Sequence, residues 1–212
     1  MKFSMIKSVL VFLFITYLFS LQVYSQDGEV FGSGDNVVGQ VGSNSTAYGI
    51  SAPVKAIGLT NIKAIATGVR HSLAVKTDGT VWIWGSYFDS RYGLAADEFS
   101  LVPRQVIGIS NVIAVAGGDY YSLALKADGT VWSWGAMNGD GVLGDRTTIA
   151  GQSPVQVSGI TNIIAIDSGT YTNLALKSDG TVWFWGANTI GYVVNGMAPK
   201  NFLLPIQIKE LS

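Results

Sequence analysis

The sequence predicts an all-β protein, a β-propeller of four-stranded blades that forms an incomplete, open arc of about three and two-thirds blades. One motif recurs as "DGTVWIWG", "DGTVWSWG" and "DGTVWFWG", beginning at Asp78, Asp128 and Asp179, at intervals of 50 and 51 residues. Each repeat holds four short β-type stretches separated by Gly or Asp-Gly turns. Beyond the first 25 residues, no stretch keeps the 3.6-residue period of an amphipathic helix.

The first stretch of each repeat is rich in alanine. "NIKAIATG" at 61–68 returns as "NVIAVAGG" at 111–118 and "NIIAIDSG" at 162–169. Small side chains suit the innermost strand of a blade, because blades converge on the propeller axis. The second stretch, "HSLAVK" at 71–76, returns as "YSLALK" and "TNLALK".

The third stretch carries the tryptophans. Side-chain alternation in "TVWIW" places Trp82 and Trp84 on one face and Val81 and Ile83 on the other. Two apolar faces are expected where each blade lies between two others, so the tryptophans are predicted to pack between blades. The fourth stretch of each unit begins at a proline, namely Pro53, Pro103, Pro154 and Pro205.

The repeats divide the chain into the units 61–110, 111–161 and 162–212. A degenerate copy of the motif, "DGEVFGSG", begins a further segment at 27–60. This segment is expected to supply only the last two strands of a further blade. Such an arc leaves an open, apolar blade face at each end, which repeat proteins normally cap. The alternatives are a fragment of a longer repeat protein, a decayed copy, or an arc completed by self-association or by a second chain.

Residues 1–25 have the features of a secretion signal. Two lysines precede an apolar run at 9–19, and "VYS" ends in a small residue that signal peptidase accepts. The alternative is a membrane anchor, but the run is shorter than the roughly 20 residues of a spanning helix. We therefore expect cleavage after Ser25. The mature chain, 26–212, is then secreted, periplasmic or at the cell surface, with no membrane contact of its own.

Composition excludes several classes of function. The formal net charge is −1 and the 13 basic residues form no cluster, so nucleic-acid binding is not expected. The chain has no cysteine, which excludes disulfides, thiolate metal ligands and cysteine nucleophiles. No phosphate loop, nucleophile elbow or metal motif is present, so no cofactor is expected.

The loops after the third stretch carry a family resemblance. "SGDNVVGQVG" at 33–42, "WGAMNGDGVLG" at 134–144 and, loosely, "WGANTIGYVV" at 185–194 resemble the "WGxNxxGQLG" segment of the regulator of chromosome condensation repeat. The resemblance extends over 27–212. It implies a propeller that is seven-bladed in complete members, and it includes secreted bacterial propellers that bind proteins through loops. It also implies that His71 is a framework residue of the repeat.

Two features could carry chemistry. His71 is the only histidine and could act as a general base, but Tyr121 and Thr172 replace it in the other repeats, which favours a structural role. "NGDGVLGD" at 138–145 is superficially like a calcium loop but lacks the late bidentate glutamate. A turn tied by Asn138 is the better interpretation, and an enzyme is not expected.

Function is therefore expected on the loops. The turn between the first two strands places Arg70, Tyr120 and Tyr171 at one equivalent position of three neighbouring blades. Rigid turns would present them as an arc of aromatic and charged tips, which interfaces favour. The candidate binding residues are Arg70, Tyr120, Tyr121 and Tyr171, with Tyr87, Phe88 and Tyr92 of a long loop. The alternative is that these aromatic residues only cover blade edges.

The sequence thus predicts an exported, non-catalytic module that binds a protein or glycan through its inter-strand loops. The alternative is a truncated structural fragment of a longer propeller-repeat protein with no independent activity.

Overall fold

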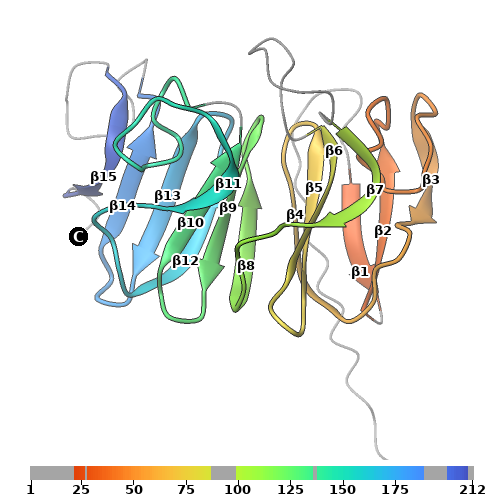
Figure 1. Cartoon of the computed structure of the whole chain (residues 1–212), viewed down its shortest axis with the longest axis horizontal. Helices are drawn as coiled ribbons and strands as arrows, with labels where there is room; N and C mark the ends of the chain where they lie inside the picture. The colour runs from red at the N-terminus through yellow and green to blue at the C-terminus, as the bar shows by residue number, and fades with distance from the viewer. Residues whose placement is uncertain (1–21, 27, 87–98, 136–137, 189–199, 210–212) are drawn as a thin grey trace, which may run out of the picture.

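The computed structural model describes residues 22–26, 28–86, 99–135, 138–188 and 200–209. Within these ranges there is no helix, and the strands form four antiparallel sheets. Figure 1 shows the sheets following one another in chain order, from β1–β3 at one end to β12–β15 at the other. The predicted all-β, open propeller arc is confirmed.

The three complete sheets, called blades 2, 3 and 4, each run from first to fourth strand in chain order. Blade 2 consists of β4 (Ile62–Thr67), β5 (His71–Lys76), β6 (Val81–Ser86) and β7 (Phe99–Gln105). Blade 3 consists of β8 (Val112–Gly117), β9 (Tyr121–Lys126), β10 (Val131–Gly135) and β11 (Gly151–Gln156). Blade 4 consists of β12 (Ile163–Ser168), β13 (Thr172–Lys177), β14 (Val182–Gly186) and β15 (Phe202–Ile208).

Blade 1 has one strand more than the sequence predicted. β2 (Glu29–Gly34) and β3 (Ile50–Lys55) are the expected pair, and β1 (Gln22–Gln26) pairs antiparallel with β2 along its whole length. β1 takes the place of a second strand, because it precedes the Asp-Gly turn as β5 does. Residues 27–60 thus supply two strands, as expected, and the additional strand comes from residues 22–26, which contain none of the repeat's motifs and overlap the segment assigned to the secretion signal.

The first strands lie innermost, as predicted, since β4 contacts β8 and β8 contacts β12. Their ends approach so closely that a Cβ atom on Gly117 would lie 2.5 Å from the backbone nitrogen of Gly68. Space for larger side chains is absent there. The fourth strands form the opposite edge of each sheet and contain the repeated prolines, which edge strands tolerate.

The tryptophans pack between blades, as predicted. Trp84 is fully buried among Val30, Ala56 and Leu59 of blade 1 and the linker that follows it. Trp134 and Trp185 occupy the same position in the next two interfaces. Burial of large apolar side chains at each of these interfaces is the main source of stability in a chain without disulfides.

Blade 4 shows how much burial each blade gains from the blade that follows it. Leu73 and Leu123 are fully buried against the following blade, whereas their equivalent, Leu174, is 39% exposed. Nothing among the described residues covers this side of blade 4 as blades 3 and 4 cover their predecessors. This face of blade 4 is therefore partly open: Leu174 is exposed, whereas Phe184, its partner on the same face, is buried beside Phe202.

The "DGTVW" motif forms a short chain of hydrogen bonds at the hairpin between second and third strands. Asp78 Oδ1 accepts from the Thr80 amide (2.9 Å) and hydroxyl (2.7 Å), and Thr80 Oγ1 accepts from Trp82 Nε1 (3.2 Å). The ammonium of Lys76 lies 4.3 Å from the centre of the Trp82 ring. The same three bonds recur in Asp128–Thr130–Trp132 and Asp179–Thr181–Trp183. The motif therefore fixes a turn, with Gly79 at a φ of +83°.

Candidate functional site

The turns between first and second strands, residues 68–70, 118–120 and 169–171, form a continuous surface that we call the turn arc. Val69 N donates to the Gly118 carbonyl (3.0 Å), and Asp119 N donates to the Thr170 carbonyl (3.1 Å). The turns of blades 2 and 3 are thus each hydrogen-bonded to the turn of the next blade through main-chain atoms. The side chains of the arc are held on a rigid support.

The turn arc presents an apolar, a basic and an acidic group in succession. Val69 is 55% exposed and Arg70 is exposed beside it. The half-buried hydroxyl of Tyr171 donates to Asp119 Oδ2 (3.1 Å), which links the turns of blades 3 and 4 through side chains as well. The arrangement offers hydrogen bonds, one cation and apolar contact, which suits recognition.

The exposure predicted for two of the candidate residues was wrong. Arg70 lies on the surface as expected, but Tyr120 is only 8% exposed and Tyr121 only 1%. The Tyr121 hydroxyl donates to the carbonyls of Gly169 (3.0 Å) and Thr172 (3.1 Å), so its ring fills the space between blades 3 and 4. Burial raises the pKa of this phenol, which stays a neutral donor.

Of the remaining candidates, Tyr171 is half-buried and bonded as described above. Tyr87, Phe88 and Tyr92 lie outside the described residues.

His71 is fully buried between blades 2 and 3, where its Nε2 lies 3.0 Å from Ser122 Oγ. Burial lowers the pKa of His71 to about 4, and a hydrogen bond with the Asp119 backbone only partly opposes this. A neutral imidazole that solvent does not reach cannot exchange protons with a substrate. Its position one blade before Ser122 matches that of Tyr121 before Thr172, which supports the framework role.

The segment resembling a calcium loop is a turn tied by an asparagine. Asn138 Oδ1 accepts from Leu143 N (3.0 Å), and its Nδ2 donates to the carbonyls of Thr147 (3.1 Å) and Ile149 (3.0 Å). The turn inserts between blades, where the Val142 carbonyl accepts from Trp185 Nε1 (2.9 Å). In the part of the chain that the structure describes, no cluster of three or more His, Cys, Asp or Glu could hold a metal ion.

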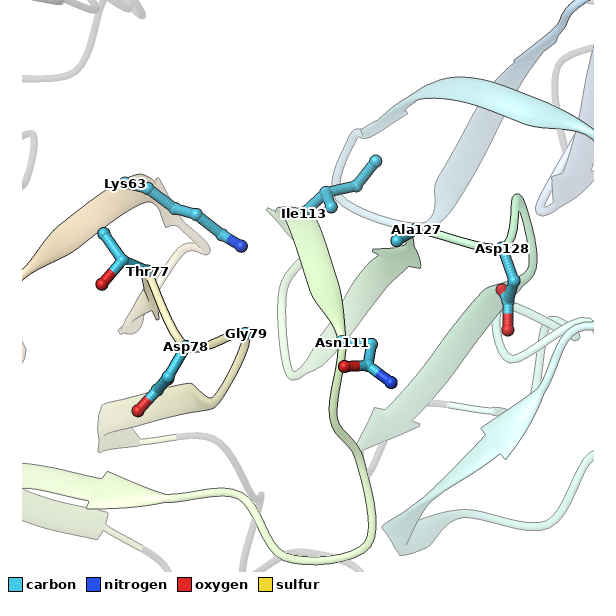
Figure 2. A pocket seen from close by; sticks show the side chains of 8 residues that line it. All are labelled: Lys63, Thr77, Asp78, Gly79, Asn111, Ile113, Ala127 and Asp128. Atoms are coloured by element: carbon cyan, nitrogen blue, oxygen red, sulfur yellow. The ribbon is translucent and has the colours of Figure 1, made fainter.

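A second feature lies at the opposite ends of the strands. A hollow of about 460 Å³ separates the Asp-Gly hairpins of blades 2 and 3, and Figure 2 shows its lining side chains. They are Lys63, Thr77, Asp78, Gly79, Asn111, Ile113, Ala127 and Asp128. Sequence reasoning missed this hollow because it sought function in the loops. The available signal was Lys63, whose equivalents are Ile113 and Ile164.

Family comparison accounts for the repeated framework. The model described as Regulator of chromosome condensation (RCC1) repeat matches residues 27–75, 78–125 and 128–176, and a second model of this repeat matches 62–93 and 112–142. The chain belongs to the regulator of chromosome condensation repeat family. Together, the matched segments of the two models contain the turn arc and all the lining residues of the hollow.

Curated relatives of this family member are much longer than the chain. The Ultraviolet-B receptor UVR8 of Arabidopsis thaliana is 40% identical over 84 residues, which are 39% of this chain and 19% of the receptor. Protein pim1 of Schizosaccharomyces pombe is 29% identical over 150 residues, 71% of this chain and 21% of pim1. The match therefore spans about a fifth of either relative's length.

Solved structures show the same arc within larger propellers. Human WBSCR16 superposes with a TM-score of 0.73 at 25% identity, over 88% of this chain and 50% of that one. Prp20p from Saccharomyces cerevisiae superposes with a TM-score of 0.74 at 20% identity, over 93% of this chain and 52% of that one. At such identity the likeness to Prp20p shows the fold alone.

The described residues contain no helix of the length and apolar character needed to cross a membrane. The turn arc and the hollow each contain a position at which the repeats of this chain differ: Arg70 aligns with Tyr120 and Tyr171, and Lys63 aligns with Ile113 and Ile164.

Proposed function

We propose that this family member is an exported, non-catalytic propeller module that binds a protein through the turn arc. The observation that carries the proposal is the pair of main-chain hydrogen bonds, 3.0 and 3.1 Å long, that join adjacent turns. They fix the backbone beneath Val69 and Arg70 while both side chains stay exposed. A preorganised surface loses little conformational entropy on binding.

The chemistry of the turn arc favours a protein over a glycan. Arginine and tyrosine are enriched among the residues that dominate protein interfaces, and Val69 adds exposed apolar area beside them. Relatives of the fold support the same class of partner. The structure of Prp20p was described together with its binding to Gsp1p and histones, and yeast RCC1 (Prp20) was also solved bound to Kap60.

The absence of catalysis is part of this proposal. His71 is buried and neutral, with a pKa of about 4, and Asp78, Asp128 and Asp179 are occupied by the hydrogen bonds of their turns. These groups hold the fold together, which leaves recognition as the role of the exposed turns.

Export rests on the composition of residues 1–25. N-terminal sequencing of the protein from culture medium or cell envelope should give Gln26 as the first residue, which would leave β2 as the first strand. Recovery of a cell-associated protein that begins at Met1 would contradict cleavage.

The test of binding uses two arginine variants with the same change of charge. Arg70→Glu reverses the cation of the turn arc, and Arg146→Glu reverses an exposed arginine of a loop between β10 and β11. Proteins from the producing organism should cross-link to the wild type and to Arg146→Glu but not to Arg70→Glu, with all three showing the same circular dichroism. A partner retained equally by Arg70→Glu would refute the turn arc as the binding surface.

A second candidate follows from the exposure of Leu174. Because Leu73 and Leu123 are fully buried by a following blade, the 39% exposure of Leu174 favours an arc completed by further repeats on another chain. Light scattering should then show a defined oligomer that Leu174→Asp dissociates into folded monomers. A soluble wild-type monomer would contradict completion by self-association.

A further inference from the structure

We propose that the hollow between blades 2 and 3 binds a glutamate side chain of a protein partner, with Lys63 as the residue that receives the carboxylate. The hollow lies at the opposite strand ends from the turn arc, because β4 begins beside Lys63 and ends beside the turn of Arg70. The inference is therefore independent of binding at the turn arc.

The floor of the hollow is fixed by main-chain hydrogen bonds. Val112 N donates to the Gly79 carbonyl (3.1 Å), which ties the hairpin of blade 2 to the first strand of blade 3. Ala127 N donates to the Asn111 carbonyl (2.9 Å), which ties the next hairpin to the same point. The volume of about 460 Å³ lies within the range of small-ligand sites and does not depend on a rearrangement of the backbone.

The charges around the hollow leave one net positive charge to attract a ligand. Asp128 is engaged, since its Oδ1 accepts from Thr130 and its Oδ2 lies 3.3 Å from the Lys126 ammonium. Asp78 Oδ1 accepts twice from Thr80. Lys63 forms no salt bridge with any residue that the structure describes, and Figure 2 shows its side chain extending from β4 toward β8. The charges of Lys63 and Lys76 both act on the Asp78 carboxylate, and Lys126 pairs with Asp128, so three ammonium groups face two carboxylates and the surplus positive charge attracts an anionic group.

The other lining groups favour a peptide rather than a free anion. Ile113, 45% exposed, lies across the hollow from Lys63 and can pack against methylene groups (Figure 2). Asp78 Oδ2 accepts no hydrogen bond within the described part of the chain and can accept a peptide N–H. Glutamate supplies this combination, with a carboxylate, two methylene groups and a backbone amide.

The position of Lys63 provides a matched variant. Ile113 and Ile164 occupy the equivalent sites of blades 3 and 4, so Lys63→Ile introduces the side chain that the repeat already accommodates. Lys63→Arg keeps the charge in the same place. Both variants should fold, and they separate the charge of the residue from its bulk.

The experiment is an amide NMR titration with N-acetyl-glutamate N-methylamide and its glutamine counterpart. The glutamate probe should give saturable shifts at the amides of Lys63, Gly79 and Asn111. The glutamine probe should bind about 2–5-fold more weakly, the effect of one exposed ion pair. Lys63→Arg should keep this preference and Lys63→Ile should abolish it, while Arg70→Glu leaves it unchanged.

Three results would overturn the proposal. They are the absence of saturable shifts at these amides, equal affinity for the two probes, and a preference that survives Lys63→Ile. A fourth titration uses a glucuronic acid oligosaccharide. Tighter binding of that probe at the same amides would replace the protein side chain with an acidic glycan as the occupant.

Discussion

Acidification should weaken this protein through a single buried group, His71. Because burial between blades lowers its pKa from 6.5 to about 4, the folded state holds the neutral form while the unfolded chain takes up a proton. The stabilisation is complete above pH 6.5 and is lost as the pH falls toward 4. The full difference corresponds to about 3 kcal/mol, of which about 2 kcal/mol should be lost between about pH 7.5 and about pH 5.

The measurement is urea unfolding followed by tryptophan fluorescence at these two pH values. His71 is the only histidine, so little else titrates between them. The matched variant is His71→Tyr, since Tyr121 holds the equivalent site of blade 3, and its stability should change little over the same interval. NMR titration of the imidazole gives the folded pKa directly in the wild type. An equal loss of stability in both proteins, or a folded pKa near 6.5, would refute the reasoning.

Three further perturbations test the packing, each by denaturant unfolding. Leu123→Ala should lower the free energy of unfolding by about 3 kcal/mol, and Leu174→Ala by only about 1 kcal/mol, because Leu174 is 39% exposed. Equal losses of stability would show that blade 4 is covered in solution. Thr130→Val should cost about 1 kcal/mol, because it removes the hydroxyl that joins the turn aspartate to the indole; an unchanged midpoint would reject that role. Gly117→Ala should lower the free energy of unfolding by about 1–3 kcal/mol, because the added Cβ atom would meet the backbone of the neighbouring turn. Gly139→Ala should leave it unchanged, because no atom lies within 4 Å of the added Cβ. Similar losses in the two variants would contradict the close approach at Gly117.

The repeat framework was predictable because each of its parts leaves a local signal. Strand alternation placed Trp82 and Trp84 on one face, and the Asp-Gly pair at residue 78 marked a hairpin, both as the structure has them. β1 was not predictable, because residues 22–26 contain none of the repeat's motifs. They pair with β2 through main-chain atoms, which any sequence provides. A strand of this kind leaves no pattern in the side chains.

The candidate site was only partly predictable, because equivalence in a repeat fixes position but not exposure. Arg70 and Tyr120 share one place in the turn, yet Arg70 is exposed and Tyr120 is 8% exposed. The difference depends on what the next blade brings to that turn, which lies about 50 residues further along the chain. Lys63 was overlooked because it lies in a strand, whereas candidate binding residues were sought only in loops.

The main-chain bonds between hairpins and first strands have a consequence for how such chains change length. Ile62 N donates to the Gly28 carbonyl, Val112 N to that of Gly79, and Ile163 N to that of Gly129. Each junction is therefore the same, and each repeat carries the glycine and the asparagine at positive φ that form it. A gene duplication or deletion that spans one whole repeat recreates this junction at the new boundary. Chain length is therefore free to evolve in steps of one blade, while point mutations in the turns alter recognition separately.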